Sequence, residues 1–280
     1  MQREVVRPLP VARPALGEDR WRIAVTSNKR RAVLLSLAPA ILVAAIVVGA
    51  TLASLPVAIG IVLAVLVVAF ACLVWWRSSR AILRQLGSHL ADEDHYARLY
   101  NLAEGLCLAS GLPQPELRVI EDPAPNAISI GRSPAEAVVV CTSGLLDRLD
   151  RMELEAVLAH ELAHVRTRDT LSGSVSAMTA GYLGIVAAAG HRLAVRGAGS
   201  AREALADQAA ISLTRYPPAL ISALEKIAAA PTTRPASLSP ALVRTTGHLW
   251  LAPLDDAAFE RKAMRGRLDL ADRVAVLREY

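Results

Sequence analysis

Forty-five consecutive residues of the chain, Ala32 to Trp76, include no Asp, Glu, Lys or Arg. A helix that crosses a bilayer needs roughly 20 apolar residues, so this run is long enough for two. The turn between them falls at Ala53 to Pro56, because Pro56 suits the first turn of a helix, where its missing N–H costs nothing. A cleavable signal peptide fits poorly, since its apolar core spans only about 7–15 residues near the N-terminus. We therefore expect a transmembrane helical hairpin over residues 32–76.

Charge on either side of the run predicts its orientation. The arm of residues 1–31 holds eight basic and three acidic residues, and Arg77, Arg80 and Arg84 follow the run. By the positive-inside rule, both ends of the hairpin face the cytoplasm. The net charge of +5 then indicates topology and attraction to a lipid bilayer. No pattern of interleaved aromatic and basic residues favours nucleic acid. We expect a multi-pass protein of the cell (inner or plasma) membrane; the sequence leaves its oligomeric state open.

Residues 77–280 form the remaining domain, and their pattern predicts a mainly helical fold of the α+β class. Residues 77–110 are expected to be helical and to end at Gly111. Three short β-rich runs, "ELRVIED", "NAISIGR" and "EAVVVCT", are separated by Pro and Gly and indicate a small sheet. "GLLDRLD" is expected to be a short helix. The cluster "HLADEDHY" at 89–96 is read as a solvated helix start rather than a metal site, and the three scattered cysteines as reduced thiols.

The next helix begins with a strong local signal. Asp150 is a candidate N-cap, and Glu153, three residues later, completes a capping box. The apolar pattern continues through "VLAHELAHV" at 157–165, which places two histidines and a glutamate in an otherwise apolar run. Burying such residues without a purpose is costly.

His160, Glu161 and His164 have the spacing of a metal site. Positions i and i+4 are neighbours on one helix face, so both imidazoles can converge on one zinc ion. Glu161 is turned about 100° from His160 and is better placed to act as a general base than to share the metal. The pattern predicts one zinc per chain and hydrolysis at a carbonyl.

A catalytic zinc usually has three protein ligands, so one is missing. His191, at the end of an apolar segment, is one candidate. "REALADQAA" at 202–210 is another, because Glu203 and Asp207 lie four apart on one helix face. Glu203 could then bind zinc, while Asp207 hydrogen-bonds an imidazole N–H and fixes its tautomer.

Together, "NAISIGRSPAEAVVVCTSGLLDRLDRMELEAVLAHELAHVRTRDT" and "REALADQAA" resemble the HtpX-like membrane zinc metallopeptidases, gluzincins related to the CAAX prenyl endoproteases. The resemblance covers roughly residues 80–280 and implies a zincin-like helical catalytic domain. It implies Glu203 as the third ligand with Asp207 as its accompanying aspartate. It also places the family's Asn-Ala-Phe element on Asn126 and Ala127, with Ile128 in the aromatic position. That element implies a strand edge that binds substrate in extended form.

The chain departs from this family near its C-terminus. In "GRLDLADRVAVL", Arg273 and Val274 stand where the family has Arg-Ile, but Arg267 and Leu268 replace His-Pro. We expect a catalytic role for Arg273, but the sequence leaves open whether Arg267, Arg273 or His248 stabilises the oxyanion; His248 reads better as structural.

Membrane topology is the second departure. The family can place two spans between the histidines and the glutamate, but only 38 residues separate His164 from Glu203 here. A single crossing would put Glu203 on the wrong side. The uncharged segment 171–190 is therefore expected to be a buried or membrane-grazing helix whose small residues suit close packing.

These observations predict three segments: a basic cytoplasmic arm (1–31), a transmembrane hairpin (32–76) and a zinc metalloprotease domain (77–280). The expected function is hydrolysis of peptide bonds in membrane or membrane-associated proteins, misfolded ones included, at the cytoplasmic face. A catalytically impaired zinc-binding regulator or scaffold is the main alternative, and processing of small molecules or prenylated proteins is another.

Overall fold

The computed structural model describes residues 57–171, 174, 202–254 and 269–280, with scattered positions between 23 and 52. The predictions for the arm 1–31, for the first half of the hairpin and for residues 172–190 lie wholly or largely outside the described residues. Across the parts of the chain that are described, no helix combines the length with the apolar composition that a bilayer crossing needs.

Helices outnumber strands among the described residues, as the α+β prediction requires. Residues 202–214 are also helical. The other elements, in chain order, are α2 (Val57–Gln85), β1 (His89–Leu90), α3 (Ala97–Ser110), β2 (Glu116–Ile120), β3 (Ala127–Ile130), η1 (Pro134–Glu136), β4 (Val138–Thr142), α4 (Ser143–Arg148), α5 (Arg151–Thr167), α7 (Pro217–Ala228), α8 (Pro240–Thr246), η2 (Gly247–Leu249) and α10 (Leu270–Leu277).

The predicted sheet is confirmed and has one strand more than the three expected. Its order is β1-β2-β4-β3. β2 and β4 are parallel, with Glu116 opposite Val138, whereas β1 and β3 pair antiparallel with their neighbours. β3 is an edge strand, and Ile128 on this strand forms a single antiparallel bridge with Trp250. The chain after η2 therefore runs beside this edge of the sheet.

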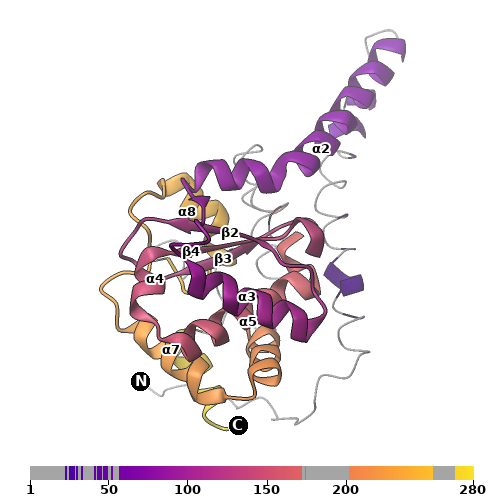
Figure 1. Cartoon of the computed structure of the whole chain (residues 1–280). Coiled ribbons are helices and arrows are strands. Elements are labelled where there is room, and N and C mark those ends of the chain that lie inside the picture. The colour runs from indigo at the N-terminus through magenta and orange to yellow at the C-terminus, as the bar shows by residue number, and fades with distance from the viewer. Residues whose placement is uncertain are drawn as a thin grey trace, which may run out of the picture.

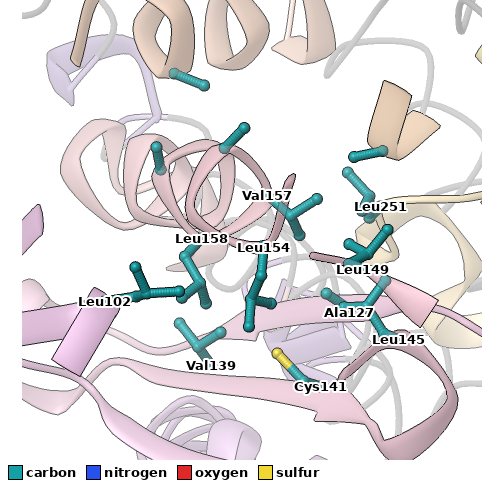
Figure 2. Close-up of a cluster of buried hydrophobic side chains, with 14 of the residues drawn as sticks. Leu102, Ala127, Val139, Cys141, Leu145, Leu149, Leu154, Val157, Leu158 and Leu251 are labelled. Atoms are coloured by element: carbon teal, nitrogen blue, oxygen red, sulfur yellow. The ribbon is translucent and has the colours of Figure 1, made fainter. Parts of the chain in front are cut away.

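Alternation along the strands produces two cores, one on each face of the sheet. On one face, α3 and α5 pack against side chains such as Val139 and Cys141, and Leu154 and Leu158 of α5 fill the space between (Figure 2). On the other face, the C-terminal end of α2 and the helix α8 cover Ile128 and Val140. Figure 1 shows the sheet between these layers, with α7 beyond α5 and the N-terminal half of α2 extending away from the body.

One expected helix is interrupted. Residues 77–110 were predicted to be continuously helical, but α2 ends at Gln85 and α3 begins at Ala97. Gly87 has a left-handed φ of 66°, which stops the helix, and β1 then pairs with β2. The end of α3 is as predicted, because Gly111 adopts φ 68° and its N–H donates to the carbonyl of Cys107.

Candidate metal site

Helix α5 presents the three residues of the H-E-x-x-H pattern. The capping box at its start is present: Asp150 accepts from the N–H of Glu153 at 2.9 Å, and Glu153 accepts from the N–H of Asp150 at 2.8 Å. This fixes where the helix begins. His160 and Glu161 are fully buried, and His164 is 2% exposed.

Three ligand-type atoms converge at this point. His160 Nε2 lies 3.0 Å from His164 Nε2 and 3.5 Å from Glu203 Oε2. One ligand atom from each of the three residues lies within 4.8 Å of the others, and all three residues are buried. Glu203 comes from the helical stretch 202–214, so two helices far apart in sequence supply the set.

Each histidine is oriented by an aspartate on its other nitrogen. His160 Nδ1 lies 2.8 Å from Asp207 Oδ1, which is the partner expected from the sequence. His164 Nδ1 lies 2.8 Å from Asp169 Oδ2, a residue that the sequence reasoning missed. A carboxylate at Nδ1 holds the proton there and leaves the Nε2 lone pair for a metal ion.

Two arginines hold these aspartates. Arg273, 1% exposed, donates from Nε and Nη2 to the two oxygens of Asp207 at 2.8 and 2.6 Å. Arg202 donates from Nε to Asp169 Oδ2 at 3.1 Å. The α10 helix that carries Arg273 is thereby fixed to the site, although the oxyanion role considered for Arg273 from the sequence is a different one.

Electrostatics favours a cation between the imidazoles. Burial alone would lower the pKa of His160, but hydrogen bonds to Asp207 and Glu203 outweigh it and raise that pKa to about 9. Burial would raise the pKa of Asp207 and of Asp169, yet the guanidinium groups of Arg273 and Arg202 hold both below the ordinary range.

The donor set fits a divalent metal. Two imidazole nitrogens and one carboxylate are the ligands of many catalytic zinc sites. With Glu203 of this set included, the site holds four carboxylates (Glu161, Glu203, Asp169, Asp207) and two guanidinium groups (Arg202, Arg273), all buried or nearly so. Metal ligation requires both imidazoles to be neutral, so His160 would give up its proton to the ion. The site then has a formal excess of two negative charges, which a divalent cation balances.

Glu161 has the surroundings expected of a reactive carboxylate. Both of its oxygens are buried, and neither has a hydrogen-bond partner among the described residues. A buried carboxylate in this condition is costly unless something else engages it. Its charge interacts with Arg202 and Arg273, and both of these arginines lie beside Glu203.

The structure places Asn126 and Ala127 inside the fold. Both are fully buried; Ala127 is the first residue of β3, and Asn126 directly precedes it. The side chain of Asn126 accepts from the N–H of Ala127 and of Ala252, each at 3.0 Å, and donates to the carbonyls of Ala252 and Thr233 at 3.1 and 2.8 Å. The N–H of Leu251 donates to the carbonyl of Ala127 at 2.9 Å. The substrate-binding role given to these residues stays a prediction.

Of the remaining sequence candidates, only His248 lies within the described residues. His248 is buried, and its backbone carbonyl accepts a hydrogen bond from Arg202 Nη1 at 2.6 Å. Arg267 and His191 lie outside the described residues. Asp169 carried one usable signal in the sequence, since it is the first acidic residue after His164 and follows it by only five positions.

A buried H-E-x-x-H helix, completed by a carboxylate from a second helix, defines a metallopeptidase of the HExxH class. Comparison with known proteins agrees. The sequence pattern of "Peptidase family M48" matches residues 93–253. The chain therefore belongs to peptidase family M48, whose members are metal-dependent, and its substrates are proteins or peptides.

Its relatives include several proteins called "Protease HtpX homolog". The one from Dictyoglomus turgidum is 37% identical over 203 residues, which is 61% of this chain and 67% of that protein. The one from Tropheryma whipplei is 32% identical over 244 residues, or 75% of this chain and 81% of that protein. The resemblance stated from the motifs is thus confirmed. No solved structure shows significant similarity to the chain.

Proposed function

We propose that the chain is a membrane-anchored zinc endopeptidase that cleaves membrane or membrane-associated proteins, misfolded ones included, at the cytoplasmic face. The observation that carries the proposal is the buried convergence of His160, His164 and Glu203, whose ligand atoms lie within 4.8 Å of one another. This donor set suits zinc better than the harder cations, because two of its three atoms are imidazole nitrogens.

His160, His164 and Glu203 would hold one zinc ion. That ion would supply a Lewis acid that polarises the scissile carbonyl. Glu161 takes the proton of the attacking water on a carboxylate oxygen and passes it to the departing amine. The burial of Glu161 suits this role, because neither of its carboxylate oxygens is hydrogen-bonded within the described residues.

Asp207 fixes the tautomer of His160, and Arg273 has two roles to be weighed. To stabilise an oxyanion, which is the role considered from the sequence, Arg273 would need a guanidinium N–H that is not already engaged. Its Nη1 donates to the carbonyl of Leu251 at 3.0 Å and lies 3.4 Å from Glu203 Oε2, while Nε and Nη2 bind Asp207. These contacts favour holding Asp207 and Glu203 in place.

Membrane anchoring is supported by the uncharged run from Ala32 to Trp76 and by side chains of α2. Large apolar residues of that helix are exposed, among them Ile61 at 57%, Val65 at 61% and Trp76 at 66%. An exposed apolar surface of this kind marks contact with lipid or protein. The basic residues at both outer ends of the run support the cytoplasmic orientation.

Replacing Glu161 by Gln tests the function directly. The detergent-purified variant should bind about one zinc per chain and should not cleave an unfolded model protein, because an amide cannot take the proton. Glu155→Gln, the same change on the same helix, is the matched control and should cleave like the unchanged chain.

Two results would count against the proposal. Cleavage by Glu161→Gln at the rate of the control would remove Glu161 as the base. Zinc binding without any cleavage by the unchanged chain would instead favour the regulator or scaffold, to which the Arg267-Leu268 departure points.

A further inference from the structure

Asp169 and Arg202 form a buried pair beside the metal set. Asp169 follows Arg168, which ends α5 in the left-handed conformation with φ 57°. Its Oδ2 lies 2.8 Å from His164 Nδ1 and 3.1 Å from Arg202 Nε. The side chains of Asp169 and Arg202 are only 10% and 9% exposed. A salt bridge this deep is costly to form unless further polar contacts compensate it.

The same order of contacts occurs on the other side of the site. On that side, His160 contacts Asp207, which contacts Arg273. On the side of the buried pair, His164 contacts Asp169, which contacts Arg202. We call each set of one histidine, one aspartate and one arginine an arm of the metal site. Both arms contact Glu203, the third ligand residue: Arg273 Nη1 lies 3.4 Å from Glu203 Oε2, and Arg202 Nη1 lies 3.7 Å from Glu203 Oε1. Each histidine thus has its own aspartate and arginine, and the two arginines flank one carboxylate.

We propose that Asp169 and Arg202 are positioning residues for the metal ion, which hold His164 and Glu203 in the geometry that ligation requires. Asp169 keeps the proton of His164 on Nδ1, so that Nε2 faces the ion as an acceptor. Arg202 fixes Asp169 and balances the charge of Glu203 on the side away from Arg273. This inference rests on the proposed zinc site and adds residues that the ligand pattern does not contain.

Arginine at position 202 is needed for its shape as well as its charge. Its guanidinium contacts Asp169 through Nε, the carbonyl of His248 through Nη1 at 2.6 Å, and approaches Glu203 with the same Nη1. A lysine ammonium is a single point charge and cannot reproduce a planar fork of donors. Arg202→Lys should therefore weaken zinc binding about as much as Arg202→Met does, although lysine keeps the positive charge.

Metal affinity is the measurement that isolates this role. In the full chain, purified in detergent, zinc affinity is measured by competition with a chromophoric chelator, and Co²⁺ is substituted to record the ligand geometry from its visible absorption. Loss of a group that orients a metal ligand typically weakens metal binding 10–100-fold. Asp169→Asn, Arg202→Met and Arg202→Lys should each fall in that range and shift the cobalt absorption.

The control removes a cation from another buried carboxylate on α5. Lys226 Nζ lies 2.7 Å from Glu153 Oε2, and the side chain of Glu153 is 4% exposed. Lys226→Met removes this cation, whose own side chain is 41% exposed, and should leave zinc affinity and the cobalt spectrum unchanged. The double variant Asp169→Asn with Arg202→Met should bind zinc about as weakly as either single variant, because both belong to one arm.

The outcomes separate this inference from the proposed function. If the unchanged chain binds neither zinc nor cobalt, the metal site and the inference fall together. If the unchanged chain binds both ions and the Asp169 and Arg202 variants bind them within twofold, only the inference is overturned. If Lys226→Met weakens binding as strongly as they do, the effect is general destabilisation and the positioning role is also refuted.

Discussion

Asn126 gives the sharpest test of how the site's surroundings are held together. It is fully buried, and its amide makes four hydrogen bonds, to Ala127, twice to Ala252 and to Thr233. Asn126→Ala removes all four. Leaving a buried polar group without its partner costs about 1–3 kcal/mol. The backbone N–H groups of Ala127 and Ala252 would both lose their acceptor. Counting only these two groups, at the middle of that range, the free energy of unfolding should fall by about 4 kcal/mol.

That loss is large enough to measure by thermal unfolding. For a domain of 150–250 residues, 1 kcal/mol shifts Tm by about 2–4 °C, so a fall of roughly 8–16 °C is expected. Asn101→Ala is the matched control, because Asn101 is exposed on α3 and alanine is the better helix former there. Its Tm should not fall.

The same variant tests the substrate-binding role predicted for Asn126. A residue that only contacts substrate would raise KM and leave Tm unchanged. If Asn126 instead holds β3 to residue 252, its replacement should lower Tm. Any change in KM would then result from weaker contacts at the β3 edge of the sheet. Equal melting temperatures for Asn126→Ala and Asn101→Ala would refute the structural reasoning.

Three further predictions concern the metal, the thiols and the topology. Chelation of the metal should lower Tm by about 5–11 °C relative to protein kept at 100 times its Kd for zinc, since binding at that concentration contributes about 2.7 kcal/mol; zinc should restore it, and an unchanged Tm would argue against a metal held by the folded state. Cys107 and Cys141 should resist thiol reagents until denaturant is added, because burial raises the pKa of both thiols; rapid labelling of the native protein, measured by mass spectrometry, would contradict this. Reporter fusions after Arg84, Thr167 and Ala210 should all report the cytoplasm, and one in the Ala53 to Pro56 turn the opposite side; an external signal at Ala210 would separate Glu203 from the histidines.

Local signals explain what the sequence predicted well. The start of α5 depends on Asp150 and Glu153, which are three residues apart, so the capping box is visible without the fold. The sequence could also pair His160 with His164 and Glu203 with Asp207, because the members of each pair lie one helical turn apart. The same reasoning failed at residues 86–96, where the two-residue strand β1 exists only because β2 is beside it.

Contacts between distant residues explain what was missed. Asp169 and Arg202 are separated by 33 positions, and nothing near either residue indicates the other. Asn126 and Ala252 are 126 positions apart, and their amides pair only after the chain beyond η2 returns to β3. Single-sequence patterns report spacing along an element, whereas these contacts depend on how elements are packed.

The contact between Asp169 and Arg202 also has a consequence for how the chain can vary. These residues stand at the two ends of the stretch 170–201, and their side chains meet at 3.1 Å. A substitution at one of them alone leaves the other charge buried without this partner, which is destabilising. The two positions should therefore change together rather than singly as the chain varies.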